Sequence, residues 1–136
     1  MALPKKLQEA LDLIRAMPKE LKAQVLLEYA KKVPTPPPGV ELERVHECQT
    51  PFFLRAEVEG GRVRLHFFVP DEAPTVKAFA GLLKEGLEGE PPEAVLSVPP
   101  TFYRGAGLEE LLTPLRLRGL EAALLRLQGQ VQRALS

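Results

Sequence analysis

The sequence has few features of a secreted, membrane-spanning or nucleic-acid-binding protein. It has one cysteine among 136 residues, so an intramolecular disulfide of the kind that stabilises small secreted domains is impossible. No apolar run approaches the roughly 18 residues that cross a bilayer, and the start of the chain lacks the apolar core of a signal peptide. Lys plus Arg is 18 and Asp plus Glu is 18, without the basic excess typical of nucleic-acid-binding proteins. We therefore expect a cytoplasmic protein that binds neither membrane nor nucleic acid.

Most of the chain shows apolar residues at helical spacing. The composition, 45% hydrophobic and 26% charged, is that of a folded chain. The predicted helices cover residues 5–16, 18–33, 71–83 (with Asp71 as the cap), 91–96 and 114–131, and residues 101–112 form helical fragments. The proline-rich segment 34–39 is a stiff connector, because it can neither continue a helix nor form a central strand.

A β-hairpin is predicted around Gly60-Gly61. Pairing segment 52–59 with segment 62–69 across this turn gives one wholly apolar face and one largely charged face, which specifies the register. A short third strand is expected within residues 40–45. The order of helices, strands and helices indicates an α+β fold, a small antiparallel sheet with helices packed on its apolar face, in a single domain over residues 1–136.

Two residue pairs on the charged face of this hairpin bear on function. His66 is expected to lie opposite Arg55 as an ordinary surface partner. Phe53 and Phe68 form an apolar pair at the end of the hairpin near Cys48. This pair is either an exposed docking surface or a patch covered by a loop or by the N-terminal helices, and the sequence favours neither.

Cys48 is the residue whose chemistry most directly suggests a function. It lies in a polar, loop-like segment just before the first hairpin strand, where a thiol is more accessible than on a helix stripe. Only a thiolate attacks sulfur electrophiles, so reactivity requires nearby positive charge. Arg44 and His46 are local candidates for that charge, and Glu47 opposes them. The alternative is a buried and inert thiol, since free cysteine is among the most buried residue types.

The two histidines allow further interpretations of Cys48. In an extended segment, His46 points the same way as Cys48 and could serve as its base. His46, His66 and Cys48 together could ligate a metal, but their spacing differs from that of structural zinc sites, so we predict no metal site. The sequence contains no Gly-rich phosphate loop, G-x-S-x-G elbow or dinucleotide fingerprint. We expect no bound cofactor.

Two motifs are similar to those of the SufE-type cysteine desulfuration proteins. Residues 45–54, which include Cys48-Gln49-Thr50, look like the family motif V-x-G-C-Q-S-x-V-W. Residues 112–120, which include Arg116, look like L-T-P-x-R-x-x-G-L at the start of the last helix. The resemblance covers nearly the whole chain in order, and its remaining segments are residues 26–34 and 73–77.

The chain departs from the family's cysteine motif at four positions. Glu47 replaces glycine, Thr50 replaces serine, and Phe52 and Phe53 lie where valine and tryptophan are typical. Glu47 adds negative charge and removes backbone freedom beside the thiol. The nucleophile itself, Cys48, is retained.

The resemblance implies a SufE/IscU-like fold and a sulfur carrier that needs no cofactor of its own. The Cys48 thiolate of such a protein would take sulfur from the persulfide of a pyridoxal-phosphate-dependent cysteine desulfurase (SufS-type), which it would stimulate. It would then pass the sulfur to an iron–sulfur scaffold protein, as an accessory sulfur-transfer protein and not a stand-alone catalyst. His46, Glu47 and Gln49 would complete the cysteine loop.

Arg116 and Arg44 are the arginines that could support this chemistry. Arg116 is expected in the first turn of the last helix, where the helix dipole disfavours a cation. We therefore expect it to lie near the Cys48 loop or to bind a carboxylate of the desulfurase. A solvated surface arginine is the alternative.

Two other functions stay open on the residues alone. A Cys–His hydrolase or thiol-dependent redox enzyme would require His46 to contact Cys48. An adaptor domain would contain Cys48 only as an inert thiol.

Overall fold

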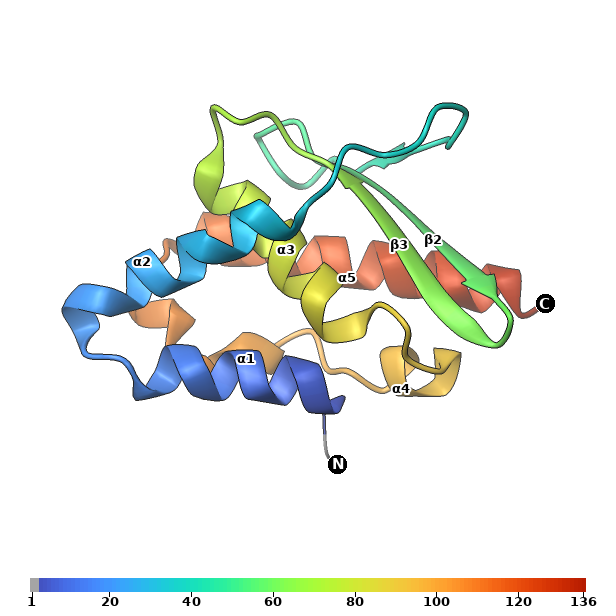
Figure 1. Cartoon of the computed structure of the whole chain (residues 1–136). Coiled ribbons are helices and arrows are strands. Elements are labelled where there is room, and N and C mark those ends of the chain that lie inside the picture. The colour runs from blue at the N-terminus through green and yellow to red at the C-terminus, as the bar shows by residue number, and fades with distance from the viewer. Residues whose placement is uncertain (1–2) are drawn as a thin grey trace.

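The computed structural model describes residues 3–136 and shows helices packed on one face of a three-stranded antiparallel sheet (Figure 1). The predicted α+β fold is confirmed. The sheet order is β1-β2-β3, with β1 at Glu43–Arg44, β2 at Phe53–Glu59 and β3 at Arg62–Phe68. The helical elements are α1 (Lys5–Ala16), α2 (Lys19–Glu28), α3 (Pro74–Leu87), α4 (Pro92–Leu96), α5 (Pro114–Ala134) and the 3₁₀ helices η1 (Tyr29–Lys32), η2 (Phe102–Ala106) and η3 (Leu108–Glu110).

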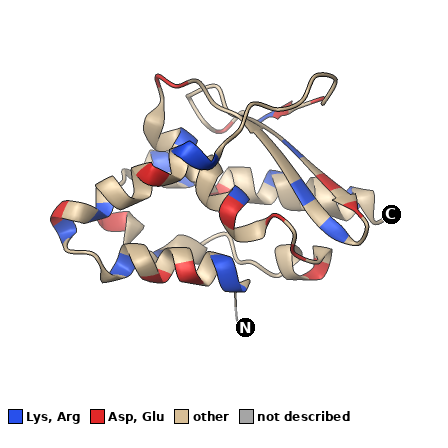
Figure 2. Ribbon diagram, viewed as in Figure 1, with Lys and Arg blue, Asp and Glu red and all other residues tan. Residues whose placement is uncertain are grey.

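The β2–β3 hairpin has the predicted register. Val58 pairs with Val63 and Leu54 with Phe67. Gly60 and Gly61 have φ angles of 59° and 77°, the positive values that a two-residue hairpin turn requires at both positions. The inward side chains of the hairpin bury its apolar face against the helices. The ribbon of the hairpin has blue and red charged residues interspersed with uncharged ones (Figure 2).

Strand β1 is shorter than the predicted range of 40–45. It pairs Glu43 with Leu54 and Arg44 with Phe53, and continuing that register would place Glu41 opposite Ala56. Instead the Ala56 amide donates to Gln130 Oε1 at 2.6 Å, and the Glu41 carbonyl accepts from Arg55 Nε at 2.6 Å. The side chains of Arg55 and Gln130 therefore bind the main-chain groups that would form the next pair of hydrogen bonds between the strands, and β1 extends no further than Glu43.

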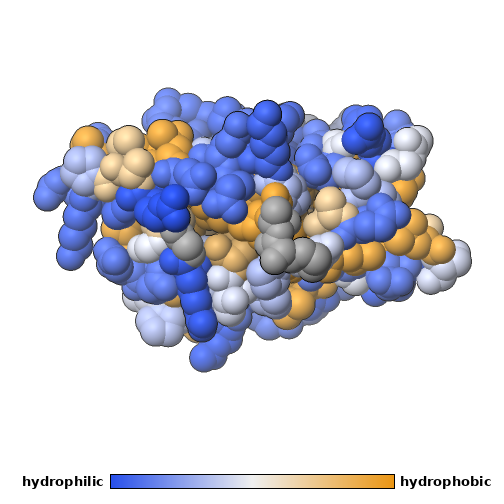
Figure 3. Space-filling view, turned by 90° about the horizontal axis from the view of Figure 1, so that it is seen from below, coloured by the Kyte–Doolittle hydropathy of each residue, from blue (hydrophilic) through white to orange (hydrophobic). Residues whose placement is uncertain are grey.

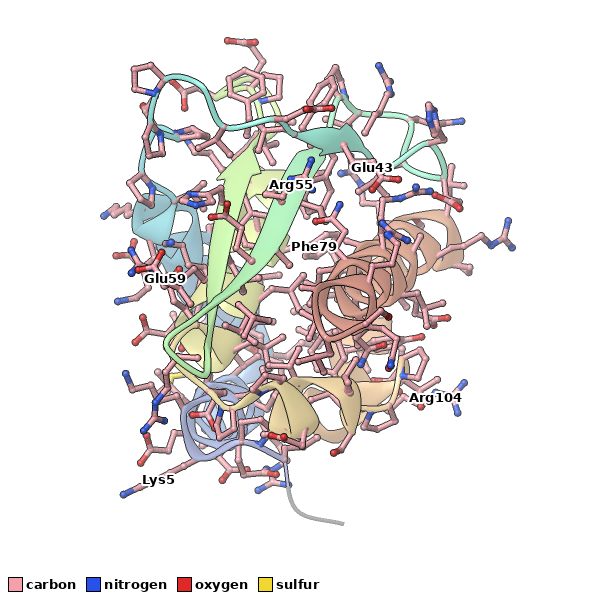
Figure 4. All side chains as sticks on the ribbon, turned by 90° about the vertical axis from the view of Figure 1, so that its right-hand side faces the viewer. Lys5, Glu43, Arg55, Glu59, Phe79 and Arg104 are labelled. Atoms are coloured by element: carbon pink, nitrogen blue, oxygen red, sulfur yellow. The ribbon has the colours of Figure 1, made fainter. Side chains whose placement is uncertain are left out.

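Helix α3 crosses the centre of the molecule, and its packing explains how the sheet is covered. Phe79 is 1% exposed and lies between the hairpin and α5 (Figure 4). At Gly81 the crossing with η1 is so close that a Cβ would lie 1.7 Å from the Tyr29 carbonyl oxygen. The predicted Asp71 cap is wrong, because Pro74 begins the helix, the N-cap falls at Ala73, and the Asp71 carboxylate instead pairs with Lys77 Nζ at 2.5 Å.

The N-terminal helices differ from the prediction in two respects. Helix α2 ends at Glu28 and tightens into η1, so residues 18–33 are not one α-helix. Leu21, which helical spacing places on the apolar stripe, is 43% exposed. Its neighbour Lys22 is buried, and its Nζ donates to the carbonyls of Ile14 and Arg15 at 3.1 and 2.8 Å. Lys22 thus binds two carbonyls at the C-terminal end of α1, where the helix dipole favours a cation; the Ile14 carbonyl also accepts from the Met17 amide at 3.2 Å.

The outer surface is predominantly polar. Seen from below, hydrophilic residues cover most of the face, and hydrophobic residues show between them in a central band (Figure 3). Across residues 3–136, none of the helices combines the length and apolar character that crossing a membrane requires.

Candidate site around Cys48

Cys48 closes a tight turn that rests on helix α5. Its backbone amide donates to the Val45 carbonyl at 3.2 Å, and the Val45 amide donates to the Phe52 carbonyl at 2.7 Å. Val45 and Phe52 are both fully buried and anchor the base of the loop. Cys48 itself is half-buried. A Cβ at Gly119 of α5 would lie 3.5 Å from Cys48 Sγ, so the bare helix backbone faces the thiol.

A hollow of about 160 Å³ opens beside the thiol. Its wall on the loop side is Gln49 and Thr50, and its other lining residues are Val76, Thr113, Leu115 and Arg116. Val76 is in the first turn of α3, and the last three residues surround the start of α5. Helix starts carry partial positive charge. The hollow therefore suits a negatively charged sulfur.

Arg116 lines this hollow together with Cys48. Its backbone amide donates to the Thr113 hydroxyl at 3.3 Å, which caps the N-terminus of α5. The side chain is exposed, and within residues 3–136 no carboxylate lies at ion-pair distance from its guanidinium. The two sequence motifs thus meet in space, with an arginine free to bind an anion next to the thiol.

His46 does not have the geometry that a Cys–His pair requires. The segment from Val45 to Cys48 is a turn and not an extended strand, so the condition under which His46 would point the same way as Cys48 is not met. His46 is exposed, and no hydrogen bond joins it to Cys48 in the described part of the chain. Within residues 3–136, no three His, Cys, Asp or Glu side chains are grouped to hold a metal ion.

His66 lies on the outer face of the hairpin. Its Cα is opposite that of Arg55, as predicted. Its side chain, however, contacts the diagonal neighbour Glu57, with 3.0 Å between Nε2 and Oε1. Arg55 turns away to the Glu41 carbonyl. His66 is therefore part of the surface polar network of the sheet.

Arg44 faces an aromatic ring. Its guanidinium carbon lies 5.7 Å from the centroid of Phe53, a cation–π distance. The centroids of Phe53 and Phe68 are 6.1 Å apart, and Phe68 is 45% exposed. The proline-rich connector lines a hollow of about 310 Å³ beside Phe68 but leaves the ring accessible. The aromatic pair is thus flanked by a loop and is not covered by it.

Glu47 forms an ion pair that the sequence did not indicate. Arg126 of α5 lies between Glu47 and Glu43, at 3.1 Å from Glu47 Oε1 and 2.6 Å from Glu43 Oε2. The pKa of Glu47 is lowered, first by a hydrogen bond from its own backbone and then by Arg126. The pKa of Glu43 is lowered by hydrogen bonds from Gln130 and Arg126. The negative charge that Glu47 brings to the loop is therefore partly offset by Arg126 of α5, which Glu47 shares with Glu43.

Comparison with known proteins identifies the family of this chain. The family described as "SufE: Fe-S metabolism associated domain" matches residues 8–131. An uncharacterized SufE-like protein of Mycobacterium tuberculosis is 39% identical over 98% of this chain and 96% of its own length. A cysteine desulfuration protein SufE of Plasmodium vivax is 29% identical over 84% of this chain and 48% of its own length.

A solved structure is also similar. The solution structure of a hypothetical protein from Thermus thermophilus is 78% identical, covers 98% of each chain and superimposes with a TM-score of 0.93. The family match covers nearly the whole chain, and the fold agrees with it. The chain belongs to the SufE family and has a role in Fe–S metabolism.

Proposed function

We propose that this protein accepts sulfur from a cysteine desulfurase onto Cys48, as a persulfide, and relays it to an iron–sulfur scaffold protein. The observation that carries the proposal is that Cys48 and Arg116, from the two motifs typical of the family, line one hollow. Membership of the SufE family supports the same function, and two relatives bear the name cysteine desulfuration protein.

The transfer is a thiol exchange that needs no external oxidant or reductant. The Cys48 thiolate attacks the outer sulfur of the desulfurase persulfide. The bond between that sulfur and the desulfurase cysteine breaks, and the desulfurase leaves as a thiolate. One S–S bond forms and one breaks, so the pair of proteins is neither oxidised nor reduced. The protein acts as an acceptor that restores the desulfurase for another turnover and is not a stand-alone catalyst.

Arg116 has a specific part in this proposal. Arg116 lines the hollow beside Cys48 and is exposed at the protein surface. A planar guanidinium binds a carboxylate through paired hydrogen bonds, which an ammonium cannot reproduce. We infer that Arg116 binds a carboxylate of the desulfurase or stabilises negative charge on the transferred sulfur.

Intact-mass analysis after incubation with a desulfurase and free cysteine tests the carrier function directly. We expect the parent protein to gain the mass of one sulfur atom, which a reducing agent removes. Cys48→Ser should fold as the parent does, gain no mass and fail to stimulate the desulfurase, because a serine oxygen cannot accept and release sulfane sulfur. Full stimulation by Cys48→Ser would exclude the proposal.

Replacing Arg116 tests the second residue of the hollow. Arg116→Ala and Arg116→Lys should each reduce stimulation at subsaturating concentration by about tenfold, since a hydrogen-bonded charge pair is lost or weakened. Arg118→Ala is the matched control, because Arg118 is exposed on the same helix but lies outside the Cys48 hollow. Equal stimulation by the parent, Arg116→Ala and Arg116→Lys would leave Arg116 without a role.

A further inference from the structure

The turn that carries Cys48 has few connections to the rest of the protein. His46, Glu47 and Gln49 are exposed. Among the hydrogen bonds of the described residues, those from Arg126 Nη2 to the two Glu47 carboxylate oxygens, at 3.1 and 3.4 Å, are the only ones that tie residues 46–50 to another element. Cys48 also packs against Gly119 of α5.

Arg126 is itself held in place by a second carboxylate. Its Nη1 donates to Glu43 Oε2 at 2.6 Å, and its side chain is 21% exposed. The other oxygen of Glu43 accepts from Gln130 Nε2 at 2.7 Å. Gln130 is 3% exposed, and its Oε1 accepts from the Ala56 amide. Glu43 lies between the strand and α5 (Figure 4). A buried amide and a strand carboxylate therefore orient the guanidinium toward the Cys48 turn.

The charges favour the arrangement in which the Cys48 turn lies against α5. One guanidinium lies between two carboxylates, and the pKa values of both carboxyls are lowered. Arg133 adds a weaker contact, 3.7 Å from Glu43, and is 70% exposed. Without Arg126, Glu43 and Glu47 would lose the cation that they share. Repulsion between them would then favour movement of the turn away from β1 and α5.

We propose that Arg126 is a positioning residue for Cys48. Through Glu47 it holds the turn on α5, with the thiol half-buried against Gly119, and it sets how often the turn opens. A thiol that must meet the persulfide of another protein has to leave this position, and one ion pair at the surface is weak enough to break on docking. Arg126 acts through Glu47 and makes no hydrogen bond with Cys48 in the described part of the chain.

Alkylation of Cys48 in the isolated protein measures this opening. The rate with iodoacetamide is followed from neutral to alkaline pH, where the midpoint reports ionisation of the thiol and the plateau reports access to the thiolate. We expect the plateau to rise about three- to tenfold in Arg126→Gln. Glu47→Gln should also raise the plateau. The double variant should raise it only slightly more than the stronger single variant, because both changes break the same Arg126–Glu47 ion pair.

Arg133→Gln is the matched control. It makes the same substitution two turns further along α5, at a residue that reaches Glu43 but, in the described part of the chain, makes no ion pair with Glu47. Its plateau should stay within about twofold of the parent, since exposed ion pairs contribute little. Arg126→Lys keeps the charge but loses the fork that spans two acids, and should fall between parent and Arg126→Gln.

Two results would overturn the assignment. One is an unchanged plateau in Glu47→Gln, a surface substitution that leaves folding intact even if Arg126→Gln proves unstable. The other is an equal rise in Arg133→Gln, which would indicate a general charge effect. The alkylation experiment contains no desulfurase, so a negative result in it does not bear on the sulfur-transfer proposal. Conversely, if Cys48→Ser still became loaded with sulfur, the positioning role of Arg126 would be unaffected.

Discussion

On the two edges of the β2–β3 hairpin, the main-chain groups of Leu65 in β3 and of Ala56 in β2 are bound by side chains of different chemistry. At the β3 edge, Glu88 Oε1 accepts from the Leu65 amide at 2.9 Å, and Lys84 Nζ donates to the Leu65 carbonyl at 2.8 Å. Lys84 and Glu88 also pair with each other at 2.8 Å, one turn apart in sequence. An acid and a base thus bind the groups that a neighbouring strand would otherwise bind.

At the β2 edge, a single neutral amide has this function. Gln130 accepts from the Ala56 amide at 2.6 Å and is 3% exposed. Beyond Ala56 the edge borders a hollow of about 630 Å³, lined among others by Val58 and the segment 39–41. Blocked edges prevent pairing with strands of other molecules. The difference is that the β2 block is buried and uncharged, whereas the β3 block is ionic and partly exposed, so mutation and pH should affect them unequally.

Gln130→Leu should have the largest effect on stability. Leucine fills the volume but leaves the buried Ala56 amide without an acceptor and removes a donor from Glu43. An unsatisfied buried polar group costs about 1–3 kcal/mol. Urea unfolding should therefore show a loss of about that size, with an unchanged slope. Parent stability in this variant would mean that water replaces the amide at this edge.

Glu88→Leu should cost less, about 1 kcal/mol, because position 88 is partly exposed, so water can reach the Leu65 amide once the carboxylate is removed. The variant removes the acceptor of the Leu65 amide and the partner of Lys84. Urea unfolding of both leucine variants under one set of conditions gives the comparison. A greater loss for Glu88→Leu than for Gln130→Leu would reverse our ranking of the two edges.

The smallest effect concerns pH. Burial alone raises the pKa of Glu88, but the hydrogen bond and charge of Lys84 and the Leu65 amide together lower it below its ordinary value. A carboxyl with a lowered folded pKa stabilises the protein above its unfolded pKa of about 4.3, and this contribution is lost as pH falls through the folded value. The stability margin of the parent over Glu88→Gln should therefore shrink below about pH 4. A margin independent of pH would show that the charge of Glu88 does not matter.

Local patterns in the sequence predicted most of the elements. Alternation around Gly60-Gly61 specified the hairpin register, and helical spacing located α1, α4 and α5. The errors arose where a distant side chain displaced a local preference. Residues 40–45 have the pattern of a strand, but the side chains of Arg55 and Gln130 bind main-chain groups that a longer β1 would use to pair with β2. Asp71 has the chemistry of a cap, but Pro74 moved the helix start away from it.

The site was predicted in part. The resemblance indicated both Cys48 and Arg116, and the fold brings them to one hollow. Arg126 was missed because it lies 79 and 83 residues from its two acidic partners, on a helix that contains several other arginines. No local pattern distinguishes an arginine that spans two carboxylates from one in solvent. The sequence left the conformation of residues 46–48 open, and they form a turn because the loop must reverse direction between the paired residues Val45 and Phe52.

The bare backbone at Gly119 also sets how much room a transferred atom has. A persulfide would place a second sulfur about 2.05 Å beyond Sγ. A methyl group at position 119, 3.5 Å from Sγ, would occupy one sector of the directions in which that sulfur can point. With hydrogen there, the outer sulfur can lie along α5 in the half-buried position and need not project into solvent, where other thiols would remove it. If Cys48 carries a persulfide as we propose, Gly119 leaves the space that the outer sulfur needs beside α5.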